Sequence, residues 1–225
     1  MSADFFKKRT IAITAGVAVF CVIIGICLYA RYLDRATVEA FSQNYYFLVS
    51  DSTHVEASTH QIVLNGGAGY SMYENGRQYI AFASYLTATE AENVQKNIQD
   101  ETQIITLSAK NLYFKKRKDK KNKKKIVGAF QTLSNCITVL NQEIVRLETG
   151  ATQESCKRIL KILEKQFRYM SKTYDGVFPS CAAVCQKAVT DLVEIGNETV
   201  YTSSLRSLQC ELCCSYIRLA KEFSL

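Results

Sequence analysis

The sequence is poor in several residue types that would indicate particular classes of protein. It has no tryptophan, one proline and ten glycines in 225 residues, while 48% of the chain is apolar. Collagen-like and low-complexity disordered chains need far more glycine and proline, so both classes are excluded. Nine cysteines in 225 residues are too small a fraction of the chain for a small scaffold held together by disulfide bonds. An ordered, mostly helical protein is expected.

The net charge of +7 arises from one short run of residues. Residues 115–125 (KKRKDKKNKKK) hold nine of the 28 basic residues and one of the 21 acidic ones, which leaves 19 basic against 20 acidic residues elsewhere. A nucleic-acid-binding protein usually spreads basic residues along a groove or helix, so no nucleic-acid partner is expected. We interpret the run as a solvated linker that self-repulsion keeps extended. Contact with lipid headgroups or anionic wall polymers is an alternative, and a nuclear-import or nucleic-acid tail is a third.

The N-terminal segment indicates a membrane anchor. Residues 11–30 (IAITAGVAVFCVIIGICLYA) carry no charge, and a helix of this length spans about 30 Å, the thickness of a hydrocarbon core. A buried helix of a soluble protein and a cleaved signal peptide are the alternatives, but the stretch is long for a signal peptide and lacks a small-x-small cleavage site. Three basic residues precede it and two follow, which favours a cytoplasmic N-terminus (residues 1–10) and an extracytoplasmic remainder. The expected localisation is the cell membrane, with a single pass.

Residues 45–108 alternate between strand-like and helix-like patterns. Strand-like runs occupy 45–50, 70–74, 78–85 and 103–107, and helix-like runs occupy 51–64 and 87–100. Asn75-Gly76 predicts a type I′ hairpin turn, and Thr87 with Glu90 resembles a capping box. The order predicts a βαββαβ module with helices on one sheet face and the other face open. Tyrosines on the open face could stack on an extended polymer, or they could merely cover the sheet.

The second half of the chain predicts a helical bundle. Four segments, 126–147, 152–174, 179–196 and 201–223, carry apolar residues at helical spacing and are separated by short Gly, Asn or Pro turns. Residues 126–225 are therefore expected to form an antiparallel bundle, which makes the chain an α+β protein.

Seven of the nine cysteines fall in the predicted bundle, and their spacing admits a metal site. Cys181 and Cys185 are four residues apart on one helix, and Cys210 and Cys213 are three apart on the next, so four thiolates could surround a zinc ion. Packing as core residues is the favoured interpretation, because a buried stripe has the same spacings. Disulfide bonds between these cysteines are a further alternative. If the four cysteines did form a zinc or thiol centre, the protein could be an enzyme, and this is one functional hypothesis.

No pattern in the chain points to a cofactor or to catalysis. His54 and His60 are six residues apart, which places them on nearly opposite faces of a helix. The GGAG sequence at 66–69 lacks the lysine and hydroxyl residue of a phosphate-binding loop. We therefore expect a protein that is not an enzyme and carries no cofactor.

Residues 45–108 resemble the SPOR (sporulation-related repeat) domain of bacterial membrane proteins. The resemblance lies in the Asn75-Gly76 hairpin, the strand QYIAFAS at 78–84 and the segment YLTATEAENVQKNI at 85–98, with YYFLVSDS at 45–52 in the place of the first strand. Where that family usually has a glutamine in this strand, followed by a glycine and an aromatic residue, the chain shows Leu48, Ser50 and Asp51. The resemblance implies binding to peptidoglycan glycan strands in cell division or sporulation, with no reaction catalysed.

The sequence thus predicts a membrane-anchored cell-envelope protein whose SPOR-like module binds peptidoglycan and whose bundle contacts other envelope or division proteins. The expected glycan contacts are side chains of the module: Tyr45, Ser50, Tyr70, Arg77, Gln78, Tyr79, Ser84 and Tyr85. The alternative is a structural or assembly protein without glycan binding, in which module and bundle are both protein-interaction domains.

Overall fold

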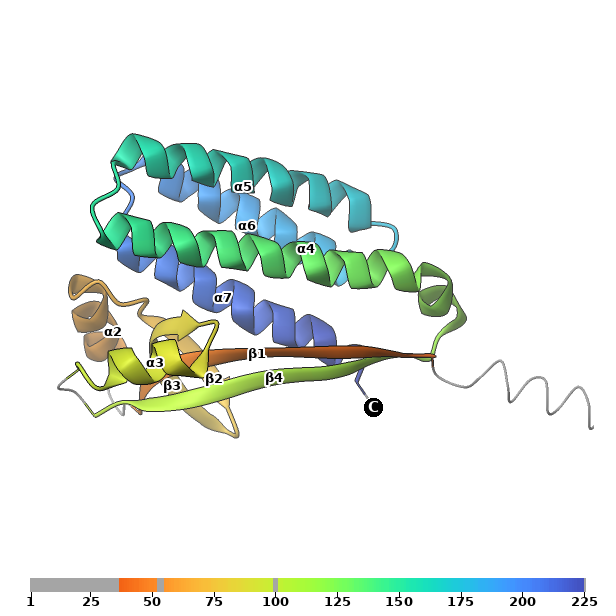
Figure 1. The fold of residues 1–225 in the computed structure, drawn as a ribbon, viewed down its shortest axis with the longest axis horizontal. Coiled ribbons are helices and arrows are strands. Elements are labelled where there is room, and N and C mark those ends of the chain that lie inside the picture. The colour runs from red at the N-terminus through yellow and green to blue at the C-terminus, as the bar shows by residue number, and fades with distance from the viewer. Residues whose placement is uncertain (1–36, 52–54, 99–100, 225) are drawn as a thin grey trace, which may run out of the picture.

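The computed structural model describes residues 37–51, 55–98 and 101–224, and it has an α+β fold. A four-stranded antiparallel sheet with two short helices is followed by four packed helices (Figure 1). The elements are β1 (Thr37–Asp51), α2 (Val55–Leu64), β2 (Tyr70–Glu74), β3 (Arg77–Tyr85), α3 (Ala88–Gln95), β4 (Gln103–Phe114), α4 (Arg117–Glu148), α5 (Gln153–Tyr174), α6 (Pro179–Asn197) and α7 (Thr202–Lys221).

The predicted membrane helix at residues 11–30 lies outside the described residues. Within the ranges that the structure describes, no helix combines the length and the apolar character needed to span a bilayer.

Local sequence signals account for the sheet and its connections. The strand order is β2-β3-β1-β4, and every neighbouring pair is antiparallel. The predicted hairpin is confirmed, since Asn75 and Gly76 take φ values of 51° and 77° between β2 and β3. The predicted capping box is also confirmed: the Glu90 N–H donates to Thr87 Oγ1 at 3.2 Å, and the Thr87 N–H donates to the Glu90 carboxylate at 3.3 Å. These local bonds fix the end of β3 and the start of α3.

The first and last strands of the sheet in chain order, β1 and β4, extend further than the sequence pattern predicts. Strand β1 begins at Thr37 and β4 ends at Phe114, and these two residues are register partners at the end of a long two-stranded ribbon. Because each strand supplies the other's backbone hydrogen bonds, the ribbon continues where side-chain alternation alone gives little signal.

The expectation of an open sheet face is wrong, because the helical bundle covers that face (Figure 1). Helix α7 packs on β2, β3 and β4, while α2 contacts β2 and β3, and α3 contacts β1, β3 and β4. Tyr45, Phe47 and Val49 alternate along β1 and join one continuous hydrophobic core with the helices. The sheet and the bundle are therefore two layers of one folded unit.

The expectation of an extended basic linker at residues 115–125 is also wrong. Helix α4 begins at Arg117 and includes most of the run before its apolar seam starts at Ile126. Lysine and arginine have good helix propensity, and an already formed helix extends at low cost into adjoining residues. Lys123 also forms an ion pair of 2.6 Å with Glu39 of β1. These interactions outweigh the repulsion between neighbouring lysines.

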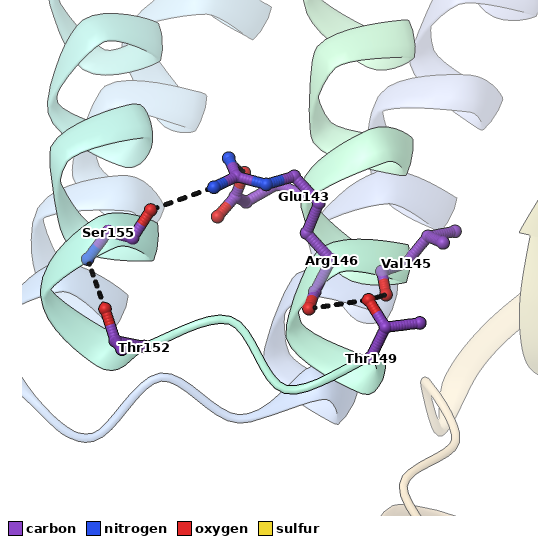
Figure 2. Close-up of polar contacts among 6 residues, drawn as sticks. All are labelled: Glu143, Val145, Arg146, Thr149, Thr152 and Ser155. Atoms are coloured by element: carbon purple, nitrogen blue, oxygen red, sulfur yellow. Dashed lines mark hydrogen bonds and ion pairs between the residues drawn. The ribbon is translucent and has the colours of Figure 1, made fainter.

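The turn between α4 and α5 is closed by a polar cluster around a buried carboxylate (Figure 2). Glu143 is 1% exposed and pairs with Arg146 at 2.7 Å, and Arg146 also donates to Ser155 Oγ at 2.9 Å across the turn. Thr149 Oγ1 donates to the Val145 and Arg146 carbonyls, while Thr152 Oγ1 accepts from the Ser155 N–H. Arg146 thus joins the last turn of α4 to the first turn of α5.

Replacing Arg146 by methionine is expected to destabilise the protein by about 2 kcal/mol, because Glu143 would remain buried without its cation. The matched control is Arg168→Met, which removes a partner of Glu164 from an exposed pair and should change stability by about 0.5 kcal/mol or less. Urea denaturation followed by circular dichroism measures both. Equal losses in the two variants would contradict the role given to Arg146.

Candidate functional site

A crevice between the sheet and the bundle has the chemistry of a binding site. It has a volume of about 290 Å³, near the lower end for small-molecule sites. Four elements line it, namely β3, α3, α4 and α7. The lining residues are Ala83, Ser84, Tyr85, Glu90, Asn93, Val94, Asn141, Ile144, Val145, Glu148, Arg206 and Gln209.

The sheet side of the crevice is set by the end of β3 and the start of α3. Ser84 is buried and donates from Oγ to Cys213 Sγ at 3.6 Å, whereas Tyr85 is only half buried. The capping box holds the Glu90 carboxylate, and Asn93 is exposed one helical turn further along α3. The side chains of this wall therefore start from backbone that local hydrogen bonds hold in place.

The bundle side carries a hydrogen-bonded polar network. Gln209 is 1% exposed and donates from Nε2 to Asn141 Oδ1 at 2.9 Å. Arg206 donates to Glu148 Oε1 at 2.5 Å and to the Gly66 carbonyl at 2.9 Å. Because a buried amide without a partner is costly, the pairing of Gln209 with Asn141 fixes both side chains. Arg206 joins α7, the end of α4 and the loop after α2.

The Tyr85 hydroxyl is a neutral hydrogen-bonding group at physiological pH. Burial raises the pKa of Tyr85 to about 12, and the neighbouring Arg206 guanidinium acts in the opposite direction. The hydroxyl can therefore donate and accept hydrogen bonds, while the ring offers an apolar face.

This combination suits a small neutral ligand with many hydroxyl or amide groups. An aromatic ring and aliphatic side chains can pack on apolar C–H faces, while carboxamides and a guanidinium can bond polar edges. The two carboxylates of the crevice are already engaged, Glu90 in a helix cap and Glu148 with Arg206. Their hydrogen bonds suit positioning of a ligand better than acid–base catalysis.

The structure separates the eight residues predicted from the sequence to bind glycan. Tyr45 and Tyr79 are buried beneath the bundle, and the Tyr45 ring packs edge-on against Tyr216 at 5.4 Å. Tyr70 is half buried against the core, and Ser50 is half buried opposite Ile80. Two of the eight, Ser84 and Tyr85, lie together in the crevice.

The other two predicted residues, Arg77 and Gln78, lie at the hairpin. Arg77 is exposed beside the turn, while Gln78 accepts from Tyr73 Oη at 3.0 Å and donates to Ser71 Oγ at 2.9 Å. They belong to the outer end of β2 and β3 and do not line the crevice.

The cysteines predicted as zinc ligands lie in separate parts of the core. Cys181 and Cys185 lie about one helical turn apart on α6, near Cys136, whereas Cys210 and Cys213 of α7 lie near Ser84. Throughout the described ranges, no group of three or more potential ligands is placed to hold a metal ion, and the seven cysteines there are free thiols. Cys210 and Cys213 are fully buried, and burial raises the pKa of both thiols.

The buried thiols predict a loss of stability at alkaline pH. Burial raises the pKa of Cys136 from 9.0 to about 11, so unfolding releases its proton between these two values. The free energy of unfolding should therefore fall as the pH rises from 9 to 11, and the contribution of the thiol is fully present below pH 9. Denaturation at several pH values should give a shallower fall for Cys136→Val than for the wild type. The same slope in both proteins would contradict the prediction.

A second concave surface runs between α6 and α7. Two adjoining hollows of about 360 and 330 Å³ share Asp191, Leu208 and Glu211. Lys187 pairs with Glu211 and lies 3.8 Å from Asp191, and Leu208 and Leu212 are among the apolar side chains of the floor. Because its two hollows adjoin, this α6–α7 groove suits a peptide segment better than a small molecule.

Sequence reasoning missed the helical half of the crevice. Asn141, Glu148, Arg206 and Gln209 were not expected to serve a site. Gln209 did carry a signal, because it stands four residues after Leu205, where the helical repeat would place an apolar side chain.

Comparisons with protein-family models, curated proteins and solved structures give no match to this chain.

Proposed function

We propose that the protein is a non-enzymatic glycan-binding protein of the cell envelope, held at the membrane by a helix at residues 11–30. Its module binds peptidoglycan strands, and its bundle contacts other envelope proteins. The observation that carries the proposal is the crevice, where Ser84 and Tyr85 of the SPOR-like segment meet the carboxamides of Asn141 and Gln209. This chemistry matches an N-acetylated sugar ring, which has an apolar face and amide and hydroxyl edges.

The topology supports the SPOR-like reading of the module. The element order βαββαβ with strand order β2-β3-β1-β4 is that of a split βαβ sheet. The open sheet face on which such a module could bind a polymer is covered by α7 in this chain. We therefore assign sugar binding to the crevice at the end of β3.

Retention of the full-length protein on purified peptidoglycan sacculi tests the proposal. The detergent-solubilised protein should sediment with intact sacculi, and more strongly with sacculi whose stem peptides an amidase has removed. Soluble chito-oligosaccharides should compete, because they present N-acetylated sugars without peptide. Absence of retention on both kinds of sacculi would refute glycan binding.

Tyr85→Ala is expected to weaken retention at least about tenfold, because it removes the aromatic wall of the crevice. The matched control is Tyr73→Ala, which deletes a 70% exposed tyrosine of the hairpin outside the crevice. Binding curves on amidase-treated sacculi measure both variants, with circular dichroism to verify folding. A loss confined to Tyr73→Ala would place the site at the hairpin and contradict this assignment.

A second candidate function is a structural or assembly protein without glycan affinity. The observations that favour it are the covered sheet face and the α6–α7 groove, which leave a helical surface for protein contacts. Sedimentation velocity of the full-length protein distinguishes the two functions. A stable oligomer that is not retained on sacculi supports assembly.

A further inference from the structure

The start of α4 forms a basic surface at one end of the folded unit. We name this surface the basic end. It consists of Lys115, Lys116, Arg117, Lys118, Lys120, Lys121, Lys123, Lys124 and Lys125. Lys115 directly follows Phe114, the register partner of Thr37, where the described chain begins. The C-terminal residues lie at the same end, since Lys115 Nζ is 3.5 Å from the Ser224 carbonyl (Figure 1).

The basic end is electrostatically unfavourable within the protein itself. Cations at a helix N-terminus oppose the helix dipole, and like charges three or four residues apart repel each other. The N-cap residue Lys116 makes no side-chain capping bond, and Asp119 is the acidic residue of the first turn. Glu39 pairs with Lys123, and the run itself holds nine basic residues and one acidic residue. An external anionic surface would stabilise this arrangement.

The position of the basic end identifies which anionic surface is nearest. Six residues, 31–36, separate the uncharged segment 11–30 from Thr37. Even a fully extended chain of this length reaches about 25 Å at most. If residues 11–30 span a bilayer, the basic end is tethered close to the headgroups of that same bilayer.

We propose that the basic end binds anionic phospholipid headgroups of the membrane that holds residues 11–30. The inference rests on the membrane helix of the proposed function and is independent of glycan binding. The folded unit then stands end-on, because the basic end and the crevice lie at opposite ends of α4. From Lys121 to Asn141 the helix rises about 30 Å, which holds the crevice away from the lipid.

Acetylation of lysines in the full-length, vesicle-reconstituted protein tests this inference. The protein is inserted into vesicles of phosphatidylcholine alone or with about 30% phosphatidylglycerol, brief acetylation follows, and mass spectrometry reports each lysine. Lys118, Lys121 and Lys124 should react at least about threefold more slowly in the anionic vesicles, and about 0.5 M salt should abolish the difference. Lys161, an exposed lysine near the middle of α5, is the internal control and should not change.

Three results of the acetylation experiment and one extraction result would contradict the proposal. Equal reactivity in both vesicles overturns the proposal, and equal protection of Lys161 overturns the end-on orientation. Protection by an added anionic wall polymer, but not by phosphatidylglycerol, assigns the surface to a different partner and also overturns it. Extraction of the protein from vesicles by alkaline carbonate overturns the membrane helix together with this inference, whereas retention on sacculi is measured separately.

Discussion

Residues 37–114, expressed without the four helices that follow, are expected to aggregate or remain unfolded. The sheet face beneath the bundle carries Tyr45, Phe47, Val49, Ala81 and Leu107, which belong to the same core as the helices. Loss of the bundle would expose this continuous apolar face to water, and a single buried layer on the other side is too small to stabilise a fragment of this length.

The matched comparison is residues 37–225, which keep the helices and lack only the N-terminal segment. This longer fragment should unfold cooperatively in urea, whereas residues 37–114 should show no cooperative transition and should precipitate or bind a hydrophobic dye. A soluble, cooperatively folding short fragment would contradict a shared core. It would instead support an independent module at residues 45–108, as the sequence pattern predicts.

Tyr216→Ala is expected to destabilise the protein by about 4 kcal/mol, because Tyr216 joins the two layers of the core. Its ring lies 6.0 Å from Phe41 and 5.4 Å from Tyr45, both on β1, and 5.2 Å from Phe130 on α4. Tyr216 is 2% exposed, so truncation would leave a cavity between sheet and helices. In thermal denaturation the midpoint should fall by roughly 10 °C.

Tyr216→Phe is the matched control, because it keeps all three ring contacts and removes only the hydroxyl. Its cost should be about 1 kcal/mol or less. A second comparison is Tyr169→Ala on the outer face of α5, where the tyrosine is 63% exposed and its loss should have little effect. Similar losses at Tyr216 and Tyr169 would show that the contact between sheet and bundle contributes little to stability.

Predictions that depended on local rules were accurate. The Asn75-Gly76 turn needs positive φ at both central residues, and few other dipeptides supply it. The capping box needs only four consecutive residues, from Thr87 to Glu90. The four C-terminal helices follow from apolar repeats that one helix face defines without knowledge of its partner.

Predictions that depended on how surfaces meet were less accurate. The open face was expected because the βαββαβ order places both helices on one face of the sheet, and because tyrosines on the other face can border solvent as readily as they can pack in a core. The sequence of β1 indicated instead that both faces are buried. Residues 45–49 are aromatic or aliphatic at odd and even positions alike, which is typical of a strand buried on both faces. The crevice could not be predicted from local sequence patterns, because it brings together residues as distant as Tyr85 and Gln209, which are 124 residues apart.

Short-range patterns are sufficient to predict the elements of the fold: a hairpin, a capped helix, a split βαβ order and four amphipathic helices. These are encoded by spacings of a few residues, so backbone sterics and hydrogen bonds within one segment decide them. Long-range packing, in contrast, is the reason that α7 covers the sheet, that the basic run is part of a helix, and that β3, α3, α4 and α7 enclose one crevice. These features depend on which apolar surfaces pack against each other. The hydrophobic effect is not directional, so the pairing of surfaces is determined only by the close packing of the whole chain.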